Sequence, residues 1–461
     1  MPHTTITAIA TYPAQSAIGI IRVSGPSVFP ILEKIFRFKT PTKTFASTLG
    51  HTLHYGFLYA EGKDIDEVLV SVFKAPASFT GEDMAEISCH GGLYVLSLAL
   101  ELLLSAGCCL AAPGEFTKRA FINGKIDLSQ AEAVADMISA DSAAALEIAL
   151  NQLKGFEKNA VTTLRKEFLH IISLVEAEID FAHEDIEKTK PIQMTVMLTA
   201  LKIQLEKLMQ NAEAGIILKN GAKVVIAGKP NTGKSSLLNA LLGTQRAIVT
   251  HIPGTTRDII EAPITLAGLP CRLIDTAGIR DTRDIIEAEG ITRAQAAIAG
   301  ADAVLFILDA SAPLDINDTA IYKTVSETKF IPVLNKTDLP TAFDNSLLNT
   351  LLGKNASRII KISALKNEGL DALTLALKNI IIPPTFSSAS EVLISSMRHR
   401  ECLKTALIKT TAALKSLTLK IPLEFTATDI KAAAEALGSI IGEVTPEEVL
   451  GNIFKNFCVG K

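Results

Sequence analysis

Residues 228–235 have the sequence Gly-Lys-Pro-Asn-Thr-Gly-Lys-Ser, which matches the phosphate-binding loop pattern G-x-x-x-x-G-K-[ST]. Glycines in such a loop let successive backbone N–H groups point at phosphate oxygens. Lys234 would reach the β- and γ-phosphates, and the Ser235 hydroxyl would ligate Mg²⁺. An apolar strand pattern over 223–227 precedes the loop and a helical pattern over 236–242 follows it, so a helix N-terminus would face the anion.

Two further segments could complete the phosphate and magnesium site. Residues 273–278, Leu-Ile-Asp-Thr-Ala-Gly, form an apolar strand pattern that ends in D-x-x-G. Asp275 can hold a magnesium-bound water, and the N–H of Gly278 can contact a γ-phosphate. Between this segment and the loop lies Gly-Thr-Thr-Arg-Asp at 254–258, from which a threonine can join the magnesium shell.

A later motif selects the base. Asn335-Lys336-Thr337-Asp338 follows the apolar residues 331–334, and N-K-x-D after a strand is typical of guanine recognition. The Asp338 carboxylate would accept from the ring N–H and from the 2-amino group, which adenine lacks, so the sequence predicts GTP rather than ATP. Ser363 and Ala364 would close the base pocket. The predicted nucleotide contacts are Asn231, Thr232, Gly233, Lys234, Ser235, Ser236, Thr250, Thr255, Thr256, Asp275, Thr276, Ala277, Gly278, Asn335, Lys336, Asp338, Ser363 and Ala364.

The residue that would activate water is less obvious. Many GTPases place a glutamine directly after D-x-x-G, but Ile279 occupies that position and can do no acid–base work. Glu287 lies further along and could orient or polarise a water molecule. A solvated glutamate near a helix start explains the spacing equally well.

The length, net charge and cysteine pattern of the chain limit the classes of protein to which it can belong. Its 461 residues suggest two to four domains, and a net charge of −4 gives no global nucleic-acid footprint. The six cysteines show no C-x-x-C pair and no signal peptide is evident, which favours a reduced, cytoplasmic protein. Residues 95–112 are largely apolar, yet Glu101 and the terminal Pro113-Gly114 favour a buried amphipathic helix over a membrane span.

The elements that must position the motifs fall into three blocks. Residues 1–120 have mixed strand and helix patterns, so we expect an α+β domain. Long three/four-spaced apolar stripes over 121–218 and 383–461 predict one discontinuous helical bundle domain, and Asp127 with Gln130 would start its first helix as a capping box. Strands alternate with helices over 219–382, which predicts an inserted, doubly wound P-loop GTPase domain of Ras-like type.

At this point the chain resembles the MnmE (TrmE) family of tRNA-modification GTPases over nearly its full length. The resemblance rests on Gly-Ile-Ile-Arg-Val-Ser-Gly at 19–25, Ser-Phe-Thr-Gly-Glu-Asp at 78–83, the stretch 113–128 from Pro-Gly-Glu-Phe-Thr to Lys-Ile-Asp-Leu, and a terminal Cys-Val-Gly-Lys at 458–461. It implies an N-terminal domain that forms a homodimer and binds 5-formyl-tetrahydrofolate or a related reduced folate. It also implies an FAD-dependent MnmG-type partner, in a heterotetramer, and a modification of C5 of the wobble uridine of certain tRNAs.

The resemblance assigns roles by position. Arg22, Glu86, Lys125 and Lys461 match the folate-contacting residues, and Cys458 matches a C-terminal cysteine that is a candidate catalytic group. Together with Lys234, Glu287 is then the candidate for hydrolysis. Ser235 and Thr256 would ligate Mg²⁺, and the ligands of a K⁺ ion would be Asn231, Thr250, Ile252 and Thr255. One departure is the sequence Pro-Ala-Gln-Ser-Ala at 13–17, where the family has a glycine-rich stretch.

Other readings stay open at this stage. The chain could be a ribosome-assembly or regulatory GTPase whose flanking domains only bind partners, although such modules would have no use for folate contacts. Each of the four folate-matched residues could be a surface or interdomain ion pair, and Cys458 could be inert. The basic runs around Lys154–Lys166 and Arg398–Lys404 could touch tRNA, but solvated helix faces explain them too.

Overall fold

The computed structural model describes residues 4–40, 44–180, 191–244, 261–275, 295–382 and 392–461. These residues divide into two compact units. One unit contains 1–139, 150–189 and 420–461, and the other contains 140–149 and 190–419. The three-domain division expected from the sequence, with boundaries at 120, 218 and 382, stays a prediction.

A seven-stranded sheet forms the N-terminal part of the first unit, in the order β3-β4-β5-β6-β2-β1-β7. Neighbouring strands are antiparallel, except that β1 pairs with β7 in parallel. The elements are β1 (Ile6–Ile9), β2 (Ile18–Ser24), α1 (Val28–Ile35), β3 (Phe36–Phe38), a 3₁₀ turn (Phe45–Ser47), β4 (Thr52–Ala60), β5 (Lys63–Phe73), β6 (Met84–His90), α2 (Leu93–Ser105) and β7 (Cys109–Leu110).

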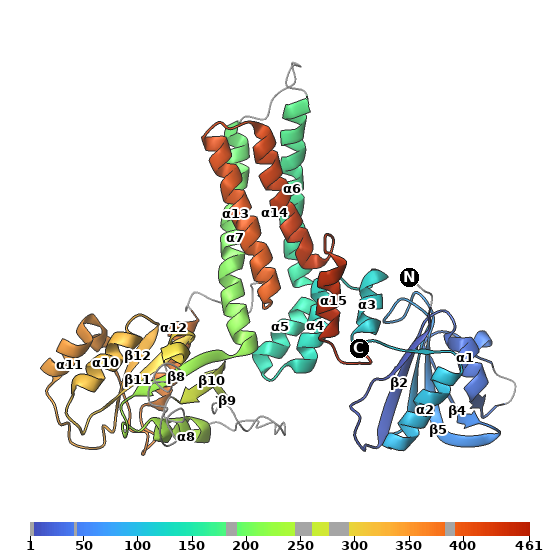
Figure 1. The fold of residues 1–461 in the computed structure, drawn as a ribbon, viewed down its shortest axis with the longest axis horizontal. Helices are drawn as coiled ribbons and strands as arrows, with labels where there is room; N and C mark the ends of the chain where they lie inside the picture. Colours follow the sequence, from blue (N-terminus) through green and yellow to red (C-terminus); the bar gives the residue numbers. More distant parts are fainter. Residues whose placement is uncertain (1–3, 41–43, 181–190, 245–260, 276–294, 383–391) are drawn as a thin grey trace, which may run out of the picture. The chain divides into compact units, whose positions relative to one another are not determined.

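One face of this sheet carries the main hydrophobic core. The other, here called the open face, has exposed side chains over β4 and β5 but is covered over β1, where Ile6 and Ala8 pack with Phe116. Helices α1 and α2 pack on the covered face, against buried residues such as Ile21, Val70 and Ile87 (Figure 1). Residues alternate across a strand, so the positions between these, including Arg22 and Glu86, are on the open face. That face is where the candidate folate-contacting residues of β2 and β6 lie.

The helix expected in the apolar stretch 95–112 is confirmed, and it ends before that stretch does. Helix α2 ends at Ser105, and β7 follows over Cys109–Leu110. Gly107 has a φ of 117°, a left-handed conformation that stops the helix at low cost. The chain then gains backbone hydrogen bonds to β1, from the N–H of Cys109 to Thr5 and from that of Ala111 to Thr7, which a longer helix would forgo.

Helices complete the first unit. They are α3 (Glu115–Ile122), α4 (Leu128–Ser139), α6 (Phe156–Asp180), α14 (Leu423–Ile441) and α15 (Glu447–Lys455), while α5 (Ala143–Leu153) crosses the division between the units. The capping box at the start of α4 is confirmed: the Asp127 carboxylate accepts from the N–H of Gln130 at 3.0 Å, and the Gln130 side chain accepts from the N–H of Asp127 at 3.0 Å. Helix α15 begins at Glu447, with Pro446 at the cap position and no side-chain cap.

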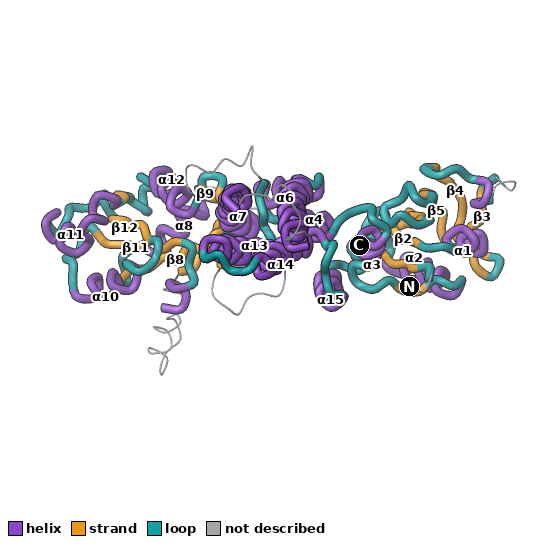
Figure 2. Tube along the Cα trace, turned by 90° about the horizontal axis from the view of Figure 1, so that it is seen from above, coloured by secondary structure: helices purple, strands orange, loops and turns teal. Residues whose placement is uncertain are grey.

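The second unit contains a six-stranded sheet in the order β13-β12-β11-β8-β10-β9, parallel except for the edge strand β9. Helices cover both faces of this sheet (Figure 2): α8 and α12 pack on one face, and α10 and α11 on the other. The elements are α7 (Pro191–Asn220), β8 (Ala222–Gly228), α8 (Lys234–Thr244), β9 (Glu261–Leu266), β10 (Leu269–Asp275), β11 (Ala303–Asp309), α10 (Ile316–Val325), β12 (Phe330–Asn335), α11 (Asn345–Leu352), a 3₁₀ turn (Gly353–Arg358), β13 (Ile360–Lys361), α12 (Leu370–Ile381) and α13 (Met397–Thr418).

This sheet confirms the predicted doubly wound domain. All seven residues of β11 are buried, as are all six of β12, which is the pattern of strands covered on both faces. The predicted motifs at 228–235, 335–338 and 363–364 follow the carboxyl ends of β8, β12 and β13. Ligands bind at that edge in open α/β sheets.

Candidate functional sites

The phosphate loop connects β8 to α8, as its sequence predicts. Gly228 lies in register with Ile307 of β11, and a Cβ on Gly228 would come within 2.6 Å of the Ile307 carbonyl oxygen. Asn231 and Gly233 both have positive φ, 64° and 89°, so the loop turns back over the start of the helix. The exposed side chain of Asn231 and the serines at 235 and 236, at the first turn of α8, lie at this turn.

Lys234 closes the loop from inside. Its side chain is buried, and its Nζ donates to the carbonyl oxygens of Gly228 at 3.0 Å and Lys229 at 2.7 Å. Thr232 adds a hydroxyl hydrogen bond to the Lys229 carbonyl at 2.9 Å. The ammonium is therefore held within the loop, where phosphate oxygens would be its stronger, charged partners.

Asn335 joins three motifs to one another. Its amide nitrogen donates to the Thr232 carbonyl at 2.9 Å, and its amide oxygen accepts from the N–H of Ala364 at 3.0 Å. A Cβ on Gly233 would come within 2.3 Å of the same amide nitrogen, so only glycine fits there. Asn335 is fully buried, and it fixes the phosphate loop and the 363–364 loop relative to the base-reading segment.

Lys336 provides a second link across the same edge. Its Nζ donates to the Asn231 carbonyl at 2.8 Å and forms an ion pair with Asp309, at the end of β11, at 2.6 Å. Burial raises the pKa of Asp309, but hydrogen bonds from Lys336 and Ser311 outweigh it and hold that pKa below its usual value. Sequence reasoning missed Asp309, although an aspartate at the carboxyl end of an apolar strand was a visible signal.

Asp338 is oriented by Ser363. The Ser363 hydroxyl donates to the Asp338 carboxylate at 2.7 Å, and this hydrogen bond is the main reason that the pKa of Asp338 lies below its usual value. Ser363 also pairs with Glu368 in an isolated β-bridge, which fixes the loop after β13. The structure thus presents an ionised carboxylate at the place where the sequence predicts guanine recognition.

Lys229 is a further residue that the sequence did not single out. Its Nζ forms ion pairs with Asp318 at 2.7 Å and Asp315 at 3.0 Å, at the N-terminus of α10. Asp315 and Asp318 also form the capping box of that helix. The phosphate loop is thereby tied to α10 as well as to β11 and β12.

The other predicted nucleotide, metal and catalytic residues of this domain lie at the edge of the described residues or outside them. Asp275 is the last residue of β10, in register with Ile226 of β8, and its side chain is not among the described atoms. The others lie outside the described residues: Thr250, Ile252, Thr255, Thr256, Thr276, Ala277, Gly278 and Glu287.

A separate charged cluster lies on the open face of the N-terminal sheet. Arg22 of β2 and Glu86 of β6 are cross-strand partners, and their side chains form an ion pair at 2.7 Å. Both side chains are only partly exposed, 19% and 24%. The Phe79 ring lies 5.9 Å from the Arg22 guanidinium carbon, so one side of the cation is covered by an aromatic face.

The C-terminal segment reaches the same cluster. Arg22 donates to the Gly460 carbonyl at 3.2 Å. Gly460 has a φ of 95°, and a Cβ there would come within 2.6 Å of the Ile9 carbonyl oxygen. Burial lowers the pKa of Lys461, and the Arg22 charge lowers it further, while Glu86 and Cys458 oppose that shift. The structure therefore brings three of the four predicted folate contacts, and Cys458, into one neighbourhood.

Lys125 contacts the 76–81 segment. Its Nζ donates to the Pro76 carbonyl at 3.0 Å, and its stem lies beside Gly81, where a Cβ would come within 3.3 Å of the Lys125 Cγ. Phe79, in the same segment, covers Arg22. This segment connects the fourth predicted contact to the other three.

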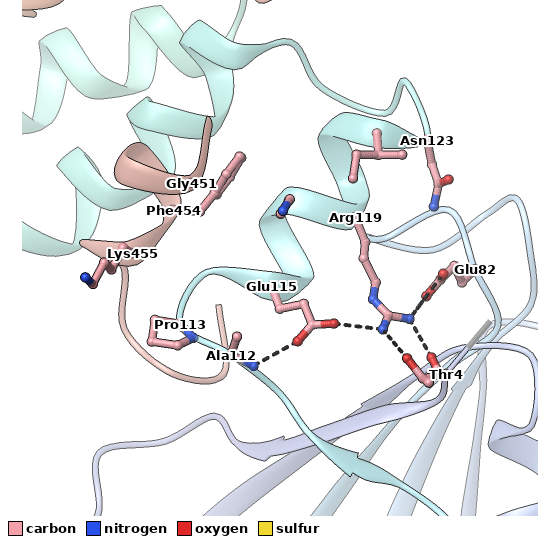
Figure 3. Close-up of a pocket in the computed structure, with 12 residues that line it drawn as sticks. Thr4, Glu82, Ala112, Pro113, Glu115, Arg119, Asn123, Gly451, Phe454 and Lys455 are labelled. Atoms are coloured by element: carbon pink, nitrogen blue, oxygen red, sulfur yellow. Dashed lines mark hydrogen bonds and ion pairs between the residues drawn. The ribbon is translucent and has the colours of Figure 1, made fainter. Parts of the chain in front are cut away.

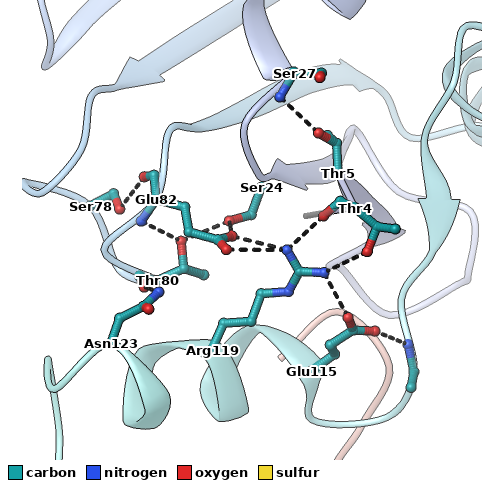
Figure 4. Close-up of polar contacts among 11 residues, drawn as sticks. Thr4, Thr5, Ser24, Ser27, Ser78, Thr80, Glu82, Glu115, Arg119 and Asn123 are labelled. Atoms are coloured by element: carbon teal, nitrogen blue, oxygen red, sulfur yellow. Dashed lines mark hydrogen bonds and ion pairs between the residues drawn. The ribbon is translucent and has the colours of Figure 1, made fainter. Parts of the chain in front are cut away.

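Arg119 holds that segment in place. Its guanidinium donates to Glu115 at 2.8 Å and to the Thr4 carbonyl at 2.8 Å, and it forms an ion pair with Glu82 at 3.1 Å (Figure 3). Glu82 also accepts from the Ser24 hydroxyl at 2.8 Å, and Asn123 donates to the Thr80 carbonyl at 2.7 Å (Figure 4). The family-like stretches 78–83 and 113–128 are therefore bonded to each other and to β2.

Part of the two basic runs is occupied by ion pairs. Lys158 contacts Asp127 at 3.6 Å, and Arg165 contacts Glu443. Arg400 and Lys404 both contact Glu401, at 3.6 and 3.5 Å. These pairs favour the interpretation of solvated helix faces over that of a continuous tRNA surface.

Comparisons with known proteins agree with this arrangement. The family profile described as the MnmE helical domain matches residues 128–458, and that described as the GTP-binding protein TrmE N-terminus matches residues 5–125. A protein of Clostridioides difficile (strain 630) named tRNA modification GTPase MnmE is 42% identical, over 99% of both chains. A protein of the same name from Listeria welshimeri is 41% identical, over the full length of both.

Solved structures match a smaller part of the chain. The G domain of the T. maritima FeoB iron transporter is 28% identical and covers 34% of this chain and 98% of its own, at a TM-score of 0.27. The relatives and profiles, by contrast, extend through the N-terminal sheet, the helices and the C-terminal segment. The chain belongs to the MnmE (TrmE) family of tRNA modification GTPases.

Proposed function

We propose that this protein hydrolyses GTP to drive modification of C5 of the wobble uridine of certain tRNAs. In this proposal it works in the cytoplasm, in a heterotetramer with an FAD-dependent MnmG-type partner, and adds an aminomethyl or carboxymethylaminomethyl group with a folate-borne one-carbon unit. Family membership supports the GTPase and tRNA-modifying roles, because the matched relatives carry the name tRNA modification GTPase. The observation that carries the folate part is the cluster of Arg22, Glu86 and Lys461.

The chemistry of that cluster suits a reduced folate. Glu86 is an acceptor for the amino and ring N–H groups of a pterin, and the cations Arg22, Lys125 and Lys461 suit the carboxylates of the folate tail. The lowered pKa of Lys461 reflects burial next to another cation, an environment that a bound carboxylate would improve. Phe79 adds an aromatic face for a planar ring.

The homodimer is supported by the open face of the N-terminal sheet. Large apolar side chains are exposed on it: Ile18 (60%), Leu53 (60%), Leu69 (39%) and Tyr55 (38%). Tyr55 and Leu69 are cross-strand partners. Ser71 of β5 is the cross-strand partner of Leu53 on one side and of Glu86 on the other. An exposed apolar patch of this kind marks an interaction surface, and here it borders the proposed folate contacts.

In the GTPase domain, the proposed site also takes Mg²⁺ and K⁺. Ser235 and Thr256 would hold Mg²⁺, and Asn231, Thr250, Ile252 and Thr255 would hold K⁺. Bound cations supply positive charge that offsets the charge developing on the transferred phosphoryl group. Asn231 suits this role because its positive φ presents an exposed amide beside the loop, while Glu287 would orient the attacking water.

Turnover of GTP in potassium and in sodium buffer at matched ionic strength tests the hydrolysis part. Strong stimulation by potassium supports the cation site at Asn231, and Asn231→Ala should remove the stimulation. Equal rates in the two buffers would contradict this part and favour an ordinary GTPase with partner-binding flanks.

Glu287→Ala separates catalysis from binding. We expect turnover to be lost while GTP affinity stays that of the parent protein. Retained turnover, or lost affinity, would remove Glu287 from the proposed catalytic role.

A further inference from the structure

The side chain of Lys229 leaves the phosphate loop and ends at the start of α10. Its Nζ lies 2.7 Å from the carboxylate of Asp318 and 3.0 Å from that of Asp315, and it donates to the Pro313 carbonyl at 3.4 Å. All three acceptors belong to one short stretch, 313–318, that leads into the helix. Lysine side chains are seldom buried unless they are paired, so these contacts explain why only 14% of the Lys229 side chain is exposed.

The Asp318 carboxylate makes this anchor hard to break. Its side chain is 1% exposed, and its Oδ1 has no hydrogen-bond partner among the described residues. Its Oδ2 accepts from the N–H of Asp315 at 3.0 Å and pairs with Lys229. Burial alone would lower the pKa of Lys229, but the hydrogen bonds to Asp318 and Asp315 outweigh it and hold that pKa above its ordinary value. Separating a buried carboxylate from its cation is strongly unfavourable, so the Lys229 side chain is fixed in place.

The backbone of the same residue holds the lysine at the end of the loop. The Lys229 carbonyl accepts from Lys234 Nζ at 2.7 Å, which is shorter than the 3.0 Å hydrogen bond from that ammonium to the Gly228 carbonyl. It also accepts from the Thr232 hydroxyl at 2.9 Å. Peptide groups are planar, and Pro230 restricts the backbone of the residue before it, so a fixed Lys229 side chain limits where this carbonyl can point.

We propose that Lys229 is a positioning residue for GTP hydrolysis: α10 anchors its side chain, and its carbonyl orients the Lys234 ammonium toward the phosphates. This role rests on the proposed nucleotide site, in which Lys234 reaches the β- and γ-phosphates. Charged groups act in phosphoryl transfer mainly through their position, and a misplacement of about 1 Å can remove much of their effect. A lysine that only stabilised α10 would leave the contacts of Lys234 unchanged.

Equilibrium binding of fluorescent GDP to the full-length protein tests this role. Lys229→Met should weaken GDP binding about tenfold and lower the turnover number for GTP by at least as much. Lys229→Arg keeps a cation within reach of both aspartates and should restore most of the binding and the turnover. Lys323→Met makes the same substitution at an exposed lysine in the last turn of α10 and should bind GDP like the parent protein. Parent-like GDP binding by Lys229→Met would overturn the proposal.

A double-mutant cycle shows whether Lys229 acts through Lys234. Lys234→Met removes the ammonium that the Lys229 carbonyl orients, so adding Lys229→Met should weaken GDP binding by no more than about twofold further. The titration uses enough protein to follow the weaker binding of Lys234→Met. A further loss of about tenfold in this background would mean that Lys229 acts independently of Lys234, and it would overturn the proposal.

Thermal stability separates positioning from damage to the fold. Lys229→Met leaves the Asp318 carboxylate buried without its cation, so the melting temperature should fall. Adding Asp318→Asn removes the buried charge, and the melting temperature should recover while GDP binding and turnover stay low, because the loop still has no anchor. Recovery of GDP binding together with the melting temperature would overturn the proposal. Parent-like GDP binding by Lys234→Met would refute the phosphate site itself, and the role of Lys229 with it.

Discussion

The nucleotide site and the Arg22 cluster are built in opposite ways. Around the phosphate loop, Asn335 and Lys336 connect motifs at the ends of adjacent parallel strands through hydrogen bonds to the backbone. On the N-terminal sheet, Arg22 and Glu86 pair across two antiparallel strands, and the last residues of the chain complete the group. The first site is a preformed frame of backbone contacts, and the second is a set of side-chain charges that a ligand would reorganise.

This difference predicts that the nucleotide site is the more sensitive to one buried polar substitution. Asn335→Ala would leave the Thr232 carbonyl and the Ala364 N–H without their partners, at a cost of about 1–3 kcal/mol each. We expect GDP affinity to fall by about a hundredfold or more, measured by fluorescence of a labelled nucleotide. Asn349→Ala, on the exposed side of α11, is the matched control.

The Asn335→Ala substitution should leave folate binding at the Arg22 cluster unchanged. If Asn335→Ala lowered folate affinity as much as GDP affinity, the two sites would not be independent and the comparison would fail. Unchanged GDP affinity would show that the backbone frame does not depend on this side chain.

Arg22→Met should have the next largest effect, and only on the N-terminal site. It removes the partner of Glu86 and a cation for the folate tail, so we expect 5-formyl-tetrahydrofolate to bind about ten- to a hundredfold more weakly. Arg22→Lys should not fully restore affinity, because an ammonium cannot copy the planar guanidinium beneath Phe79. GTP affinity serves as the internal control, and full folate affinity in Arg22→Met would remove Arg22 from the site.

Gly460→Ala tests whether the C-terminal segment is positioned by its backbone. The added Cβ would lie 2.6 Å from the Ile9 carbonyl oxygen at a φ of 95°, so the segment must move and displace Lys461. Folate affinity should fall about tenfold, by the loss of one charged contact, without loss of the fold. Val459→Ala, at an exposed neighbouring side chain, should bind folate like the parent protein, and equal affinity in both variants would sink the idea.

The smallest expected effect is a pH dependence confined to the N-terminal sheet. Hydrogen bonding to Asp66 raises the pKa of His90 above 6.5, and the charge of Asp66 adds to it. A raised folded-state pKa means that this contribution to stability is complete below the unfolded pKa and is lost as pH rises through the folded value. The melting temperature difference between the parent protein and His90→Asn should shrink over that window, and a difference that is constant or grows with pH would contradict the assignment.

The two sites also differ in how far the sequence predicts them. The nucleotide site is encoded in short motifs, each after a strand, so spacing alone predicts its position, the base and the doubly wound sheet. The Arg22 cluster joins residues 22, 86 and 458–461, and no local spacing connects an open sheet face to a chain terminus. Before the structure, only the resemblance to a family predicted that these residues form one site.

Neither the sequence motifs nor the family resemblance predicted some of the contacts. Lys229 lies inside the loop motif, but its ion pairs with Asp315 and Asp318 depend on where α10 packs, which periodicity does not specify. The apolar stretch 95–112 does not by itself show that a strand follows α2, because the pairing of β7 with β1 is a long-range contact. Local patterns therefore predicted elements, and tertiary pairing decided their ends.

Calorimetric titration of 5-formyl-tetrahydrofolate tests the central claim most directly, using the full-length protein and a variant that ends at Val459 and so lacks Gly460 and Lys461. The account predicts saturable folate binding by the full-length protein and a loss of at least about tenfold in the variant, with GTP affinity equal in both. Absence of folate binding by the full-length protein, or equal folate affinity in the two, would contradict it.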